Sequence, residues 1–318
     1  MLPFARVAII GMGLIGSSLA RAVRDAMPTV RLVVTDASPD VRMRVVELGL
    51  ADDVADGAGA AVIDADLVIL CVPVGAMAAV AAEIAAELAP DTVVSDVGSV
   101  KQSVERVLGA ALPGVHVIPA HPVAGTEKSG PDAGFGGLFR GRWCIITPPP
   151  RADEVMVERL SEFWRRLGAR VDLMDAAHHD RVLAVTSHLP HLIAYSIVGT
   201  ASDLETVTKA EVIKYSAGGF RDFTRIAASD PVMWRDVFLN NREAVLELLG
   251  RFTEDLVALQ RAIRWGEGDA LESLFTRTRA IRRSIIDEGQ DTDRADFGRD
   301  GSGPDGPGIP GPKRTVPK

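Results

Sequence analysis

The sequence predicts an α/β N-terminal domain with a doubly wound parallel sheet, followed by an all-α C-terminal domain. Short β-branched runs alternate with helical patterns in the first half of the chain, and the strand signal disappears beyond Asp175. Such alternation is typical of a mostly parallel sheet with helices on both faces. The expected strands are Val7–Ile10, Leu32–Thr35, Leu67–Val72, Thr92–Ser95, Val115–Ile118, Cys144–Thr147 and Val171–Met174.

The first expected strand runs directly into a glycine-rich turn. Gly11, Gly13 and Gly16 form a GxGxxG motif, and Asp36 stands at the end of the second strand. In this motif the glycines permit a tight turn, close approach of a pyrophosphate and close helix packing, while the carboxylate binds ribose hydroxyls. The pattern predicts a Rossmann-type domain that binds NAD, with the free amides of Leu14 and Ile15 at the pyrophosphate.

Two features nearby bear on the same cofactor site. Cys71, Val72 and Pro73 end another expected strand, where a cofactor would lie, although Pro73 could simply terminate the strand. The carboxylate of Asp36 would repel the 2′-phosphate of NADP. Arg42 and Arg44 follow it closely, so NADP stays open as a second cofactor.

The chain is expected to have three regions. Residues 1–172 would form the α/β domain and residues 173–289 the helical domain, with one long helix over Pro231–Trp265. Residues 290–318 are crowded with Gly, Pro and Asp and lack apolar periodicity. Such a segment cannot offset the entropy lost on ordering, so we expect a disordered tail.

Composition excludes several classes of protein. A chain of 318 residues with 47% hydrophobic and 25% charged residues can bury a core. Its net charge of −8 argues against a surface that binds nucleic acid or anionic membranes. Two cysteines, Cys71 and Cys144, are too few for a disulfide framework and indicate a cytoplasmic protein. The alanine-rich stretch Val74–Leu88 is short and carries two glutamates, so no membrane span is expected.

Two loops bring polar side chains to the cofactor edge of the sheet. The run DVGSVK contains Ser99, and the run HPVAGTE begins with His121. Here an imidazole could accept a proton from a substrate alcohol during hydride transfer, and a hydroxyl could orient the ring. Alternatively, Ser99 caps the helix that begins near Lys101, and His121 is a turn residue held by Pro122.

The helical region adds three polar motifs, SHLPH, GGFRDFTR and DPVMW. An arginine in a glycine-flanked loop can bind a carboxylate in bidentate fashion. Taken singly, His188 and His191 could be partly buried helix residues, and Arg221 and Arg225 could be solvated.

Taken together, the motifs from GxGxxG to DPVMW resemble the prephenate/arogenate dehydrogenase family, which includes cyclohexadienyl dehydrogenases. The resemblance covers roughly residues 5–288. It implies a Rossmann domain, a helical domain that binds substrate and forms a homodimer, and an active site in the cleft between them.

The resemblance also implies roles for individual residues. His121 matches the catalytic histidine, and Ser99 matches the serine that orients it and approaches the nicotinamide. Arg225 matches the arginine that anchors a substrate carboxylate, and His191 is similar to a histidine that binds substrate and inhibitor. The same resemblance places Ser187, His188, Thr126, Glu127, Asp222 and Trp234 at the substrate.

The implied reaction is the NAD-dependent oxidative decarboxylation of prephenate or arogenate in tyrosine biosynthesis. Oxidation of the ring alcohol and loss of carbon dioxide make the ring aromatic, so no metal is needed. His121 would take the hydroxyl proton while Arg225 positions a carboxylate.

Two other functions are considered. A β-hydroxyacid dehydrogenase would use a lysine early in the helical domain, but no lysine precedes Lys209 there. A non-enzymatic NAD-sensing regulator would not need Ser99 beside His121. The choice between prephenate and arogenate, and inhibition by tyrosine, stay open.

Overall fold

The computed structural model describes most of the chain and divides it into two compact units. The described residues are 2–126, 128–203 and 218–287. Residues 1–251 form one unit and residues 252–318 the other. The expected disordered tail, residues 290–318, lies outside the described residues, so that expectation stays a prediction.

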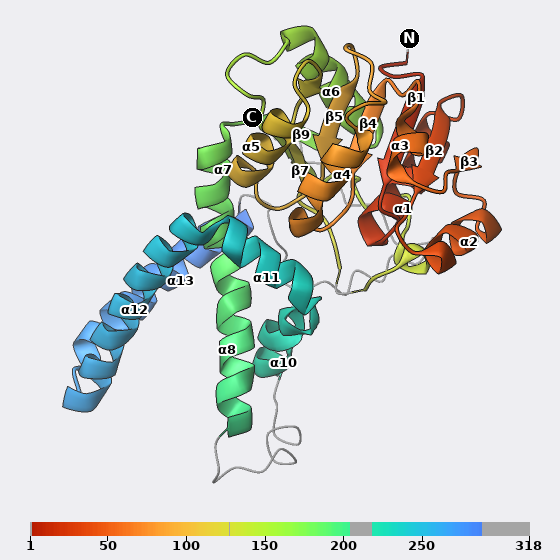
Figure 1. Ribbon diagram of the computed structural model, residues 1–318. Helices are drawn as coiled ribbons and strands as arrows, with labels where there is room; N and C mark the ends of the chain where they lie inside the picture. The colour runs from red at the N-terminus through yellow and green to blue at the C-terminus, as the bar shows by residue number, and fades with distance from the viewer. Residues whose placement is uncertain (1, 127, 204–217, 288–318) are drawn as a thin grey trace, which may run out of the picture. The chain divides into compact units, whose positions relative to one another are not determined.

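The first unit is built on a parallel six-stranded sheet with the strand order β3-β2-β1-β4-β5-β6 (Figure 1). Its strands are β1 (Arg6–Ile10), β2 (Arg31–Thr35), β3 (Asp53–Val54), β4 (Leu67–Leu70), β5 (Val93–Asp96) and β6 (His116–Val117). All neighbouring strands run parallel. The order reverses between β1 and β4, which is where doubly wound sheets bind their ligands.

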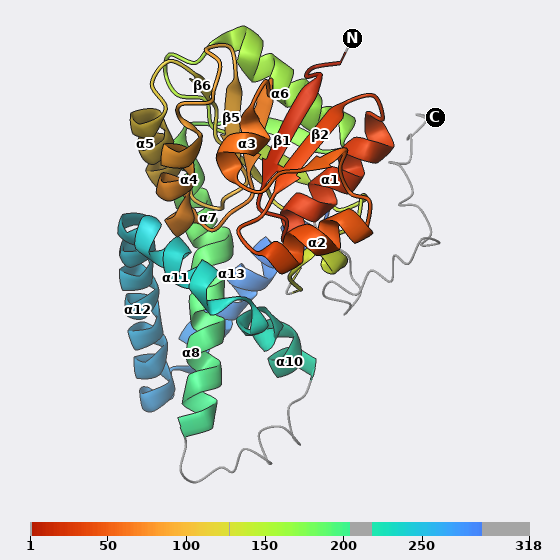
Figure 2. The same ribbon diagram turned by 45° about the vertical axis from the view of Figure 1, so that its right-hand side comes forward.

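Helices cover both faces of this sheet because its strands are apolar on both sides. Val7 and Ile9 of β1 pack in a core with α1 and α6, while Ala8 and Ile10 pack in a second core with α3, α4 and α5. The helices are α1 (Leu14–Ala26), α2 (Pro39–Glu47), α3 (Ala58–Val62), α4 (Met77–Ile84), α5 (Gln102–Ala111) and α6 (Glu154–Arg166). Figure 2 shows α3 and α4 on one side of the strands and α6 on the other. The predicted α/β class is confirmed.

A second, three-stranded sheet corrects part of the prediction. It consists of β7 (Ala120–Pro122), β8 (Trp143–Ile146) and β9 (Arg170–Leu173), and β7 runs antiparallel to β8. The expectation that the last two strands extend the parallel sheet was therefore wrong. Ile118 still donates its amide to Val94, but Pro119 has no amide hydrogen to continue that ladder, and the chain leaves the sheet there.

Every described regular element after β9 is a helix, as predicted. These elements are α7 (Ala176–Leu183), the π-helical turn η3 (Ala184–His188), α8 (Leu189–Asp203), α10 (Gly218–Thr224), the 3-10 turn η4 (Arg225–Ala228), α11 (Pro231–Asn240), α12 (Arg242–Trp265) and α13 (Gly268–Asp287). Two further 3-10 turns, η1 (Val74–Ala76) and η2 (Pro131–Ala133), lie in the α/β part.

The long helix expected over Pro231–Trp265 is two helices, which is a second correction. α11 ends at Asn240, and Asn241 adopts φ −111° and ψ 33°. The side chain of Asn241 donates to the backbone oxygen of Asp180 and lies 3.0 Å from Nδ1 of His188. These buried contacts hold Asn241 outside the helical conformation.

One apolar helical stretch escaped the sequence analysis. Residues Ala176–Asp203 are long and apolar enough to cross a membrane, by length and composition alone. The start of this stretch is packed inside the protein, where His179, Asp180 and His188 are fully buried. Such composition is weak evidence for a membrane span, because helices in protein cores and between subunits share it.

Candidate active site

The glycine-rich turn lies where β1 meets β4. Gly11 has a φ of +96°, and a Cβ atom there would lie 2.5 Å from the backbone oxygen of Cys71. A Cβ on Gly16 would overlap the backbone oxygen of Gly11. Gly13 differs, since a Cβ there would meet no atom within 4 Å. The first and third glycines therefore serve packing, whereas the middle one leaves open space before α1.

The residues around this turn fit a dinucleotide. α1 begins at Leu14 without a side-chain cap, so its first amides are available to bind an anion. The Asp36 carboxylate is held beside the turn, where Oδ2 accepts from the amide of Met12 (2.7 Å) and Oδ1 from that of Ser38 (2.9 Å). Each oxygen keeps lone pairs for a ribose hydroxyl.

The two arginines that left NADP open are both engaged elsewhere. Arg42 donates to the backbone oxygens of Asp36 and Ala37. Arg44 forms ion pairs with Asp132 (2.6 Å) and Glu47 (2.7 Å). In the structure both guanidinium groups are thus engaged by protein groups.

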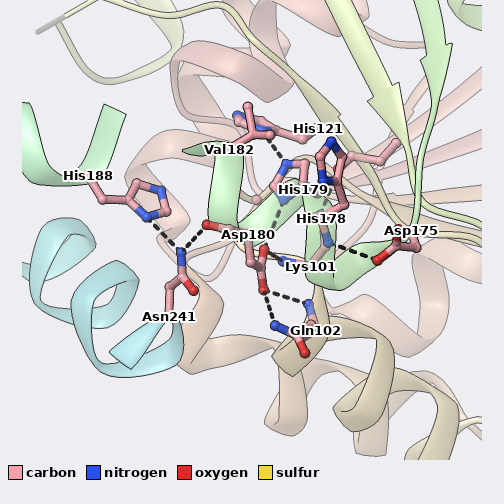
Figure 3. A network of polar contacts seen from close by, with 12 residues as sticks. Lys101, Gln102, His121, Asp175, His178, His179, Asp180, Val182, His188 and Asn241 are labelled. Atoms are coloured by element: carbon pink, nitrogen blue, oxygen red, sulfur yellow. Dashed lines mark hydrogen bonds and ion pairs between the residues drawn. The ribbon is translucent and has the colours of Figure 1, made fainter. Parts of the chain in front are cut away.

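His121 lies on β7 rather than in the expected loop, and it leads into a buried chain of polar groups (Figure 3). Its Nδ1 lies 2.9 Å from Nε2 of His179, and Nδ1 of His179 lies 2.9 Å from Oδ1 of Asp180. His121 is 8% exposed, whereas His179 and Asp180 are fully buried. His121 is thus the least buried of the three groups.

The protonation of this chain follows from its surroundings. Burial lowers the pKa of His121 well below its ordinary value, and the neighbouring His179 and Lys101 lower it further. Burial also lowers the pKa of His179, against the effect of Asp180. Burial alone would raise the pKa of Asp180, but hydrogen bonds from His179 and from the amides of Gln102 and Lys101 outweigh it and lower that pKa. At neutral pH both imidazoles are neutral and the carboxylate is ionised.

A buried ion pair fixes the strand that carries His121. Nζ of Lys101 lies 2.5 Å from Oδ2 of Asp96 and donates to the backbone oxygen of Ala120 (2.8 Å). The amide of Ala120 donates to Asp96 Oδ1 (3.3 Å). Burial raises the pKa of Asp96 and lowers that of Lys101, and each opposite charge works against the shift. The pair thus ties β7 to the end of β5.

Ser99 does not have the contacts that were expected. No hydrogen bond between Ser99 and His121 is found among the described residues. The alternative in which Ser99 caps α5 is also wrong, because the helix begins after Lys101 and its first amides donate to the carboxylate of Asp180. The backbone of Ser99 instead lies close enough to His188 to influence its pKa.

The helical part contributes a second group of rings. Trp234 stacks on His191, with centroids 3.7 Å apart and planes at 24°, and meets His188 edge-on at 6.0 Å. Nδ1 of His191 lies 2.8 Å from the backbone oxygen of Ser187. Burial lowers the pKa of His191, and the charge of Arg225 lowers it further. Five of the predicted substrate residues are therefore near one another: Ser187, His188, His191, Trp234 and Arg225.

The remaining predicted substrate residues are not tied into this group. Thr126 is exposed and its hydroxyl accepts from the amide of Lys128, and Asp222 is half-buried on α10. Glu127 lies outside the described residues. His179, Asp180 and Asn241 were not among the predicted site residues. The adjacent residues His179 and Asp180 could have been noticed in the sequence, because a neighbouring imidazole and carboxylate can form a hydrogen-bonded pair.

Comparison with known proteins identifies the family. The model of the prephenate dehydrogenase nucleotide-binding domain matches residues 19–173, and that of the prephenate dehydrogenase dimerization domain matches residues 175–277. The chain belongs to the prephenate dehydrogenase family. It is thus an oxidoreductase of that family with an N-terminal nucleotide-binding domain.

Individual relatives agree with this assignment. The cyclohexadienyl dehydrogenase of Zymomonas mobilis is 45% identical over 90% of this chain and 97% of its own length. The prephenate dehydrogenase of Bacillus subtilis is 34% identical over 85% of this chain and 72% of its own length. The Aquifex aeolicus prephenate dehydrogenase, solved with hydroxyphenyl propionate and NAD+, is 33% identical with a TM-score of 0.80, over 90% of this chain and 98% of the other.

The buried histidines predict a loss of stability in acid. Burial lowers the pKa of His188 from 6.5 to about 4, so below pH 6.5 the unfolded chain binds a proton that the folded chain does not. The free energy of unfolding should then fall by about 2 kcal/mol between pH 7.5 and 5 through His188 alone. Urea unfolding across this range should show a shallower pH dependence for His188→Gln. The exposed His178→Gln should behave as wild type, and equal slopes in all three proteins would contradict the prediction.

Proposed function

We propose that this protein catalyses the NAD-dependent oxidative decarboxylation of prephenate, arogenate or both, in tyrosine biosynthesis. The observation that carries the proposal is a nearly buried, neutral imidazole, His121, in a chain whose glycine turn and Asp36 fit a dinucleotide. The name of the Zymomonas mobilis relative, cyclohexadienyl dehydrogenase, favours acceptance of both substrates.

The cofactor site would be formed by the turn and the adjoining strand ends. The amides of Leu14 and Ile15 would bind the pyrophosphate, the open face of Gly13 would admit it, and Asp36 would bind a ribose. NAD, when bound, supplies the acceptor for the hydride of the ring alcohol. The strand end at Cys71, Val72 and Pro73 would line this site.

The chemical step would use His121 as the base. Its Nε2 accepts the hydroxyl proton of the substrate, which it can do because the ring is neutral at physiological pH. The hydroxyl of Ser99 would help to align the alcohol. Arg225 would bind a substrate carboxylate, while the stacked ring of Trp234 keeps His191 in place at the same end. Loss of the other carboxylate as carbon dioxide completes the aromatic ring.

We also propose a cytoplasmic homodimer in which residues 1–172 bind the cofactor and residues 173–289 bind substrate and the second subunit. The description of the matching family model as a dimerization domain supports this arrangement. Ile197 and Val198 on α8 are each 40% exposed, and contact with a second subunit would explain the apolar character of that helix. The free cysteines fit a reducing compartment.

The activity is tested directly with purified protein. Incubation with NAD and either prephenate or arogenate should produce reduced nicotinamide, carbon dioxide and the matching aromatic product, and NADP should support a much slower reaction. The measurement follows nicotinamide absorbance and identifies the product by chromatography. If neither substrate yields reduced nicotinamide, the proposal is wrong.

Replacing the base separates chemistry from binding. His121→Asn should lower kcat by about 10³-fold, since a positioned base typically contributes this much, while the Kd for NAD changes little. Steady-state kinetics and calorimetry give the two quantities. His116→Asn, a substitution on the neighbouring strand β6, should keep normal turnover. Near-normal turnover of His121→Asn would remove this residue from the mechanism.

The glycines offer a matched pair for the cofactor site. Gly13→Ala should fold normally, because the added methyl meets only open space, yet the Kd for NAD should rise at least about 10-fold as the methyl blocks the pyrophosphate. Gly16→Ala should instead lower Tm, since its methyl overlaps the backbone of Gly11. Calorimetric titration and thermal melts distinguish the two effects. Unchanged NAD affinity in Gly13→Ala would contradict the proposed site.

A further inference from the structure

The buried residue Asp180 is fixed by hydrogen bonds to its carboxylate and to its backbone oxygen. Its Oδ1 accepts from the amide of Lys101 (2.7 Å) and lies 2.9 Å from Nδ1 of His179. Its Oδ2 accepts from the amide of Gln102 (3.0 Å), and its backbone oxygen accepts from the side chain of Asn241 (2.8 Å). Figure 3 shows these contacts converging on Asp180 behind the two histidines. Neither the side chain nor its helix has freedom to turn away from His179.

This arrangement determines where the protons of both imidazoles lie. An ionised carboxylate only accepts hydrogen bonds, so Nδ1 of His179 must carry the hydrogen that it donates to Asp180. In a neutral His179 the other nitrogen, Nε2, then has a lone pair. Its hydrogen-bond partner among the described residues is Nδ1 of His121, 2.9 Å away, which must donate. His121 is left with an unprotonated Nε2.

The opposite tautomer of His121 is excluded by the same contacts. A hydrogen on Nε2 of His121 would leave lone pairs on both nitrogens of the 2.9 Å contact with His179. Two facing lone pairs in a buried, low-dielectric site are strongly unfavourable. His179 itself is fully buried and cannot reach a substrate. Its effect on the reaction must therefore pass through His121.

We propose that Asp180 and His179 are positioning residues, which hold His121 in the tautomer whose Nε2 can accept the substrate's proton. The inference rests on the proposed function of His121 as the base. When His121 takes up that proton, its Nδ1–H still donates to His179, and the ionised Asp180 lies one ring away from the new positive charge. The chain thus orients the base and stabilises its protonated form, as the acid member of a Ser-His-Asp triad does for its histidine.

The test replaces the carboxylate by an amide of nearly the same shape. Asp180→Asn removes the negative charge from the chain. If the NH₂ group faces Nδ1 of His179, it donates, reverses the direction of donation along the chain and places a hydrogen on Nε2 of His121. If the oxygen faces His179 and the amide of Lys101, the tautomer is kept but no carboxylate stabilises the protonated form of His121. We expect kcat to fall by at least about 10²-fold, because the corresponding change in a Ser-His-Asp triad costs about 10⁴-fold. KM and the Kd for NAD should change by less than about 3-fold, since binding contacts are retained.

A matched control removes a structural carboxylate from the same helix. The side chain of Asp175 caps α7 by accepting from the amide of His178 (2.8 Å). Its backbone oxygen accepts from the amide of His179 (3.0 Å), a contact that a change of side chain leaves in place. Asp175→Ala should lower Tm, because it removes the N-cap side chain, but should keep kcat. If Asp180→Asn keeps kcat within about 3-fold of wild type, or if both variants lose kcat in proportion to their loss of Tm, the positioning role is wrong.

A second measurement does not depend on turnover. In protein labelled with nitrogen-15 at its 6 histidines, the chemical shifts of the ring nitrogens report which nitrogen carries the hydrogen. With signals assigned through single histidine substitutions, wild-type His121 should be protonated at Nδ1. A wild-type His121 protonated at Nε2 would overturn the inference even in an active enzyme. The predicted tautomer in a protein without turnover would instead refute only the proposed function.

Discussion

The site is organised around the hydrogen bonds between the Asp180 carboxylate and the first amides of α5. Burying an ionised carboxylate costs several kcal/mol unless hydrogen bonds and opposite partial charge replace its hydration. Here the amides of Lys101 and Gln102 and the dipole of α5 supply that replacement. The same contact joins α7 of the helical part to α5 of the α/β part. Asp180, on the first helix after β9, is thereby held close to His179 and to β7, the strand that carries His121.

Lys101 extends this arrangement into a second buried charge. Its amide binds Asp180, while its ammonium group pairs with Asp96 and binds the backbone of Ala120. One residue therefore sets both the carboxylate behind His179 and the strand position of His121. A neutral residue at 101 would leave Asp96 buried and unpaired, and such a change is typically far more destabilising than loss of a surface ion pair.

The parts of the site that were predictable depend on local geometry. The GxGxxG turn and Asp36 follow from what one turn and two adjacent strands require, and the structure places them as expected. His179 and Asp180 were not predictable in this way, because their partners His121 and Lys101 lie far away along the chain. The strand β7 was missed for a related reason: only its pairing with β8 makes three residues a strand. The helix break at Asn241 depends on a buried contact with Asp180, and the helical periodicity of the sequence cannot predict such a contact.

A base inside the protein brings a thermodynamic cost along with its chemical advantage. Nearly complete burial keeps His121 neutral at physiological pH, and the partly dry surroundings strengthen its hydrogen bond to His179. The same burial disfavours the cation that forms when His121 accepts a proton. An ionised carboxylate two residues along the hydrogen-bonded chain offsets that penalty without contacting the substrate. A carboxylate directly beside His121 would raise the pKa of this base, so that more of it would already be protonated before the reaction. The intervening imidazole of His179 resolves this conflict, because it transmits orientation strongly and charge only weakly.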